Sequence, residues 1–130
     1  MSGLPDHPVV LPSLMSADML RLGEQLGGLI AAGTSAVHVD VMDLHFVPNL
    51  TVGPDFTRAI AGPVHEAGGT VDVHLMVGRP AEAIGLFAPY ADAITVHVEA
   101  DPVSYTHLTL PHRHGTDGFF IARLRRPESS

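Results

Sequence analysis

The chain has 130 residues, of which 45% are hydrophobic and 16% are charged, and this balance excludes general disorder. It has no cysteine, which excludes a disulfide scaffold and a thiol nucleophile, and all seven basic residues are arginine, which excludes a lysine Schiff base. The formal net charge of −7 argues against nucleic acid or an anionic membrane as a partner. Because the sequence shows neither a membrane span nor the layout of a signal peptide, we expect a cytoplasmic protein.

Residues 8–102 alternate between strand patterns and helix patterns. A short apolar run at 9–11 predicts a buried strand, and apolar residues at helical spacing predict a helix that Gly33 ends. Runs rich in β-branched residues predict strands at 36–41, 71–76 and 93–98, a short, weak helix is expected at 54–60, and Arg79-Pro80 opens another helix. Four such strands predict a parallel sheet covered by helices. The pattern fits an open doubly wound sheet and a (β/α)₈ barrel equally well.

The charge reverses near residue 103. Residues 1–102 contain three arginines against eight aspartates and four glutamates, whereas the rest contains four arginines, one aspartate and one glutamate. This change predicts two pieces of different origin or role, residues 1–102 and residues 103–130.

Three predicted strands each carry two ionisable residues that are two positions apart. The pairs are His38 and Asp40, Asp72 and His74, and His97 and Glu99. Residues i and i+2 of a strand point to the same face, so all three pairs can meet near the carboxyl ends of parallel strands. A single buried histidine is usually only a hydrogen-bonded core residue, but three equivalent pairs favour a site. Imidazoles beside carboxylates predict a divalent metal such as Zn, Mn or Fe(II).

Three methionines follow the strand ends at similar offsets. Met15, Met42 and Met76 can be core filler, or they can line the pocket as an apolar lid over the metal site.

Three segments resemble the ribulose-phosphate 3-epimerase family: residues 12–18 (PSLMSAD), 38–49 (HVDVMDLHFVPN) and 72–77 (DVHLMV). The resemblance covers residues 8–102 and implies the fold class, an α/β (β/α)₈ TIM barrel truncated to about four parallel strands with covering helices. It also implies the interconversion of D-ribulose 5-phosphate and D-xylulose 5-phosphate by transfer of the C3 proton. The implied cofactor is one divalent metal ion: Zn, Fe(II), Mn or Co.

The resemblance assigns roles to four residues. Asp40 is implied to be both the catalytic acid/base and a metal ligand, His38 and His74 to be metal ligands, and Ser13 and His74 to contact the substrate. The weaker candidates His97 and Glu99 are assigned to the pocket wall. The family's second catalytic aspartate, its fourth metal ligand and its phosphate-binding loops are expected beyond residue 102, and we therefore expect the 130-residue chain to be inactive. A family-type homo-oligomer is expected only for a full-length protein.

Two features depart from the family pattern. Leu44 stands where the family has glycine, and a leucine costs roughly 1 kcal/mol or more if that backbone needs a positive φ. Residues 103–111 (VSYTHLTLP) do not continue the pattern and resemble the translation of a transposase sequencing adapter. We therefore expect residues 103–130 to be an unrelated, disordered or artefactual tail. A short basic docking tail is the biological alternative.

Two other functions remain open at this point. A hexulose-phosphate 3-epimerase would carry nearly the same motifs, and a half-barrel without catalytic activity could bind a metal or a partner chain.

Overall fold

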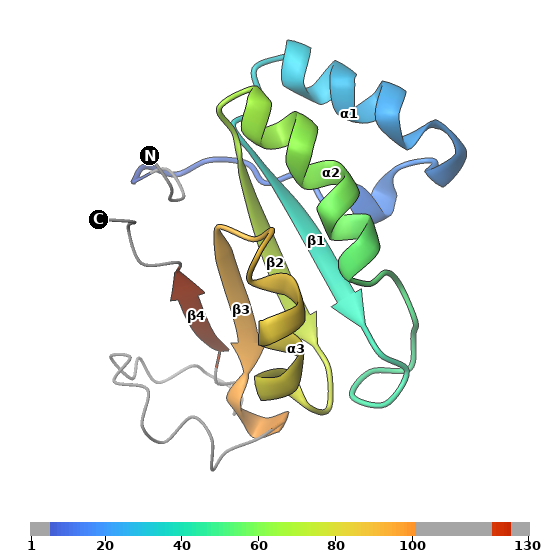
Figure 1. Ribbon diagram of the computed structural model, residues 1–130, viewed down its shortest axis with the longest axis vertical. Helices are drawn as coiled ribbons and strands as arrows, with labels where there is room; N and C mark the ends of the chain where they lie inside the picture. Colours follow the sequence, from blue (N-terminus) through green and yellow to red (C-terminus); the bar gives the residue numbers. More distant parts are fainter. Residues whose placement is uncertain (1–5, 101–120, 126–130) are drawn as a thin grey trace.

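The computed structural model describes residues 6–100 and 121–125, the latter as backbone (Figure 1). The helices are α1 (Leu22–Ala31), α2 (Pro54–Glu66) and α3 (Pro80–Phe87), and the strands are β1 (Ala36–Met42), β2 (Thr70–Met76), β3 (Ala93–His97) and β4 (Ile121–Arg125). Short 3₁₀ turns occupy Leu14–Ser16, Met19–Arg21 and Val98–Ala100. The order of the strands in the single sheet is β1-β2-β3-β4.

Strands β1, β2 and β3 are parallel, and helices cover one face of the sheet. Helix α2 packs against β1 and β2, α3 packs against β2 and β3, and α1 lies beside α2 (Figure 1). This α/β arrangement confirms the predicted strands at 36–41 and 71–76, and the helix that opens at Arg79-Pro80. Gly33 follows α1 with a φ of 94°, as expected for the residue that ends a helix.

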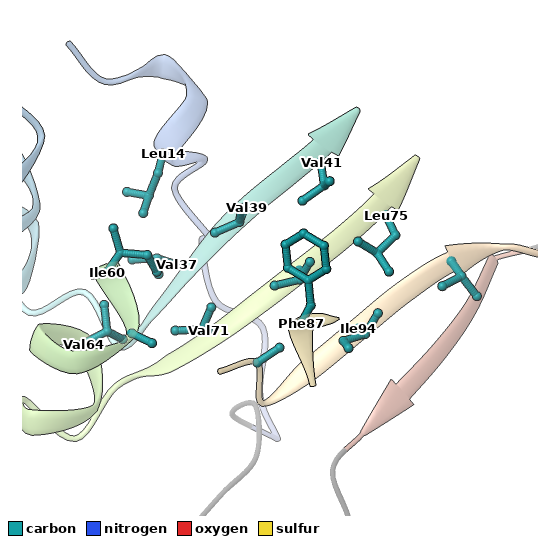
Figure 2. Packing of buried hydrophobic residues seen from close by; sticks show 14 of the residues in the cluster. Leu14, Val37, Val39, Val41, Ile60, Val64, Val71, Leu75, Phe87 and Ile94 are labelled. Atoms are coloured by element: carbon teal, nitrogen blue, oxygen red, sulfur yellow. The ribbon is translucent and has the colours of Figure 1, made fainter. Parts of the chain in front are cut away.

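Alternation along the strands divides the sheet into an apolar face and a polar face. The buried side chains of β1 to β3 on the helix-covered face are Val37, Val39, Val41, Val71, Val73, Leu75, Ile94 and Val96. They pack with Ile60 and Val64 of α2 and Phe87 of α3 (Figure 2). The intervening residues of the strands therefore lie on the opposite face, which carries the ionisable pairs.

The predicted strand at 9–11 is wrong. This segment has no regular structure, and Val10 is 86% exposed. The residues that follow it meet β1 through a bridge between Ser13 and His38 and a hydrogen bond from the His38 N–H to the Pro12 carbonyl. Prolines at 8 and 12 have no N–H to donate, so they interrupt a strand ladder here.

The prediction of four parallel strands and a disordered tail also needs correction. Residues 121–125 form β4, which pairs antiparallel with β3, so the parallel part of the sheet has three strands. An uncovered outer edge of β3 would leave backbone N–H and C=O groups unpaired, and the pairing with β4 gives them hydrogen-bond partners. The rest of the tail lies outside the described residues, and its adapter origin remains a prediction.

Helix α2 is longer than the expected helix at 54–60, because it continues through Pro63 to Glu66. Its buried residues Thr57, Ile60, Ala61 and Val64 recur at helical spacing, so burial against the sheet outweighs the local helix-breaking tendency of Gly62-Pro63. Within the part of the chain that the structure describes, no helix is both long and apolar enough to cross a membrane.

Candidate active site

The register of the parallel strands brings the ionisable pairs together on the polar face. His38 lies opposite Asp72, and Asp40 lies opposite His74, in the pairing of β1 with β2. His74 in turn lies opposite Thr95 of β3, which places His97 two residues further along the same face.

Asp40 is at the centre of the cluster. Its Oδ1 lies 3.0 Å from His38 Nε2 and 3.3 Å from His74 Nδ1. One donor atom from each of these three half-buried residues lies within 4.8 Å of the other two. Two imidazole nitrogens and one carboxylate oxygen form a donor set that suits Zn, Fe(II), Mn or Co, so the residues present fit the divalent metal that the family resemblance implies.

A buried carboxylate orients the His38 ring. His38 Nδ1 lies 2.8 Å from Asp72 Oδ2, and Asp72 is 2% exposed. This hydrogen bond to Asp72 raises the pKa of His38 above its ordinary value of 6.5, outweighing the opposite effect of burial. With Nδ1 engaged by Asp72, Nε2 is the ring nitrogen that faces Asp40. Such a carboxylate–histidine pair is a common support for metal-binding histidines.

The second imidazole has a different environment. Burial lowers the pKa of His74 below 6.5, and the nearby His97 acts in the same direction. His74 is therefore biased toward the neutral imidazole, the form that binds metals. Its Nε2 lies 2.7 Å from His97 Nε2, and His97 Nδ1 lies 3.1 Å from Glu99 Oε1.

Two hydroxyl groups hold Asp40 from other directions. The Ser13 hydroxyl donates to Asp40 Oδ2 over 2.8 Å, and the Thr51 hydroxyl donates to the Asp40 carbonyl over 2.6 Å. Thr51 Oγ1 also accepts the N–H of Met42 at 3.0 Å, so it fixes the carboxyl end of β1. Sequence reasoning selected Ser13 but missed Thr51, because an isolated threonine after a loop carries no pattern.

The loop after β1 is fixed by Asp43. Its Oδ1 accepts the N–H groups of His45 and Phe46, and its Oδ2 accepts the Gly78 N–H at 2.8 Å from the loop after β2. Leu44 has a φ of 67°, so the backbone does adopt the left-handed conformation for which the family's glycine is suited.

The remaining candidates lie around the cluster. Met42 and Met76 are half-buried partners in the register of β1 and β2, and half-buried Met15 packs against the core. His97 is buried, and its ring centroid lies 5.2 Å from that of Phe46, whereas His45 is exposed.

Comparison with known proteins identifies the family of the chain. The sequence model of the ribulose-phosphate 3 epimerase family matches residues 9–127, a range that runs past residue 102. The chain is 47% identical over 103 residues to a ribulose-phosphate 3-epimerase of Synechocystis, covering 78% of this chain and 44% of the relative. It is 42% identical over 119 residues to that of Bacillus subtilis (91% and 54%), and 48% identical over 91 residues to that of Treponema pallidum (69% and 40%). The chain thus spans about half the length of the curated relatives it matches. On the extent of the family match and these identities, the chain belongs to the ribulose-phosphate 3-epimerase family.

Proposed function

We propose that this chain supplies the Asp40 half of a ribulose-phosphate 3-epimerase site. The reaction interconverts D-ribulose 5-phosphate and D-xylulose 5-phosphate. The observation that carries the proposal is the Asp40 carboxylate, held between two imidazoles and a hydroxyl within a family whose curated relatives are named for this reaction. One divalent metal ion, bound by His38, Asp40 and His74, belongs to the same proposal.

The two oxygens of Asp40 have different surroundings. A bound divalent cation supplies positive charge that makes a C–H bond beside a ketone more acidic. Oδ1 faces the two imidazoles, so Oδ2 is the oxygen that is left to take up or return the C3 proton. The Ser13 hydroxyl donates to Oδ2 and fixes its direction. Ser13 and His74 would then contact the substrate, with Met15, Met42 and Met76 lining its pocket.

Epimerisation removes a proton from one face of C3 and delivers another to the opposite face. Asp40 can serve one face. Among the described residues, the metal-compatible cluster contains no second carboxylate, and Asp72 is hydrogen-bonded to His38. We therefore expect no measurable epimerisation by the 130-residue chain alone.

The test restores the part of the relatives that this chain does not span. Residues 1–100 are fused to the remaining half of the Bacillus subtilis relative, and conversion of ribulose 5-phosphate is assayed with and without a chelator. We expect metal-dependent turnover by the fusion and none by the 130-residue chain. The fusion that carries Asp40→Asn should lose turnover. It should also lose exchange of the C3 proton with solvent on the face of the substrate that Asp40 serves. An active Asp40→Asn fusion would contradict the proposed role of Asp40.

The same fusion distinguishes the substrate classes. We expect a strong preference for the pentulose phosphate over a hexulose 6-phosphate, and the opposite preference would assign the site to the hexulose-phosphate alternative. Metal analysis of the purified fusion would identify which of Zn, Fe(II), Mn or Co it retains. A cytoplasmic location and homo-oligomerisation of the complete protein belong to the same proposal.

A further inference from the structure

The contact between His74 and His97 is a hydrogen bond between ring edges. Their Nε2 atoms are 2.7 Å apart, whereas the ring centroids are 4.9 Å apart with an angle of 23° between the planes. Stacked rings cannot bring two nitrogens this close, since their separation would be set by van der Waals contact between the faces. The rings therefore meet edge to edge and are nearly coplanar, and one Nε2 must donate to the other.

The neighbours of His97 decide which nitrogen donates. His97 is 8% exposed, so its ring nitrogens need hydrogen-bond partners. Its Nδ1 lies 3.1 Å from Glu99 Oε1, and a carboxylate can only accept. A neutral His97 that donates from Nδ1 to Glu99 has a lone pair at Nε2, and it accepts the proton carried by His74 Nε2.

When a cation is bound at Asp40, this chain of hydrogen bonds favours one tautomer of His74. With its proton on Nε2, the neutral imidazole of His74 has its lone pair on Nδ1, the nitrogen that lies 3.3 Å from Asp40 Oδ1. These two atoms are both acceptors in this tautomer, and the divalent cation of the proposed function would be shared by them. The opposite tautomer would turn the lone pair of His97 Nδ1 toward Glu99, placing two acceptors 3.1 Å apart.

We propose that His97 and Glu99 are positioning residues that make His74 a metal ligand through Nδ1. The inference rests on the metal site of the proposed function and assigns to two residues outside the ligand set a role beyond lining the pocket wall. In this arrangement each of the two histidine ligands is oriented by a carboxylate. Asp72 holds His38 so that its Nε2 faces Asp40, and Glu99 acts through His97 to hold His74 so that its Nδ1 faces Asp40.

The experiment measures Zn²⁺ binding and tautomers in the 130-residue chain. Calorimetric titration with Zn²⁺ alone gives the affinity, and long-range ¹H–¹⁵N spectra of histidine-labelled protein identify the protonated and metal-bound nitrogens. We expect Zn²⁺ on Nδ1 and a proton on Nε2 of His74. Glu99→Ala should weaken Zn²⁺ binding by about 10- to 100-fold, the range typical of groups that support metal ligands. Glu99→Gln keeps an acceptor oxygen and should lose less.

A second histidine–aspartate pair provides the control. His65 Nε2 lies 2.7 Å from Asp92 Oδ2, and Asp92 also accepts the N–H of Val71 near the start of β2, away from the cluster. His65→Gln removes a comparable contact and should leave Zn²⁺ affinity and the His74 tautomer unchanged.

Three results would overturn the inference: Zn²⁺ on Nε2 of His74, wild-type Zn²⁺ affinity in Glu99→Ala, or an equal loss of affinity in His65→Gln. Failure of the chain to bind Zn²⁺ would overturn it as well. An inactive fusion whose 130-residue counterpart shows the expected Zn²⁺ results would contradict the proposed function and leave the inference standing.

Discussion

Leu44 offers a test of how much backbone strain the loop after β1 stores. Its φ of 67° lies in the left-handed region, and its N–H donates to the Asn49 carbonyl at 2.8 Å, which closes the loop in that conformation. The side chain is 61% exposed, so replacing it sacrifices little packing. We expect Leu44→Gly to stabilise the protein.

The magnitude follows from two opposing effects. A residue with a Cβ in the left-handed conformation costs roughly 1–2 kcal/mol, which glycine does not incur. Glycine also makes the unfolded chain more flexible, which lowers stability by about 0.4–1 kcal/mol. The net increase in the free energy of unfolding should therefore be about 0.5–1 kcal/mol.

Urea unfolding followed by circular dichroism measures this difference. Leu44→Ala is the matched control, because it also removes the exposed side chain but keeps the Cβ that causes the strain. We expect no increase in stability for Leu44→Ala. Equal free energies of unfolding for the alanine and glycine variants would refute the reasoning, since the gain would then not depend on φ.

Two further predictions concern the Asp43 carboxylate of the same loop and the packing around two glycines. Burial tends to raise the pKa of Asp43, but the N–H groups of Gly78, Phe46 and His45 outweigh it and hold that pKa below 3.8. The ionised carboxylate therefore stabilises the fold near neutral pH, and this contribution is lost as the pH falls through the folded-state pKa. Asp43→Asn should lower the urea midpoint near neutral pH, and the difference from wild type should shrink toward pH 3. The control Asp6→Asn, at an exposed position, should leave the urea midpoint unchanged at both pH values. A difference between Asp43→Asn and wild type that stays constant across this range would contradict the prediction. A Cβ on Gly69 would lie 3.0 Å from Val64 Cγ1, so Gly69→Ala should lower the free energy of unfolding by about 1–3 kcal/mol. Gly27 lies inside α1, where an added Cβ would meet no atom within 4 Å beyond the helix's own backbone, so Gly27→Ala should raise the free energy of unfolding by roughly 0.5–1 kcal/mol. The same sign for both variants would contradict the packing explanation.

The sequence predicted those parts of the fold that depend on local alternation. Valine runs at alternate positions identified β1 and β2, and the residues between the valines identified one polar face. The run at 9–11 has the same apolar character, but its flanking prolines break the ladder. At Pro63 the helix-breaking tendency of proline led to a predicted helix that was too short. Burial of one face of α2 stabilises the helix beyond this residue.

Spacing within a strand could predict which side chains share a face, but it could not predict their hydrogen bonds. His38 bonds to Asp72 of the neighbouring strand, and His74 bonds to His97 of the next strand. Both contacts depend on the register between neighbouring strands, and the sequence of a single strand does not specify that register. Thr51 shows the same limit, because only the folded loop brings its hydroxyl close enough to donate to the Asp40 carbonyl.

The register of β1 against β2 therefore determines the chemistry of the site as well as the packing of the sheet. A shift by one residue would turn the valines of one strand to the polar face, and loss of the core contacts opposes that shift. A shift by two residues would keep the apolar face intact but remove His38 from Asp72 and Asp40 from His74. Apolar burial alone does not distinguish this second arrangement from the native one. The contacts of His38 with Asp72 and of His74 with Asp40 form only in the native register, so the residues that prepare the metal site also help to select the register in which it exists.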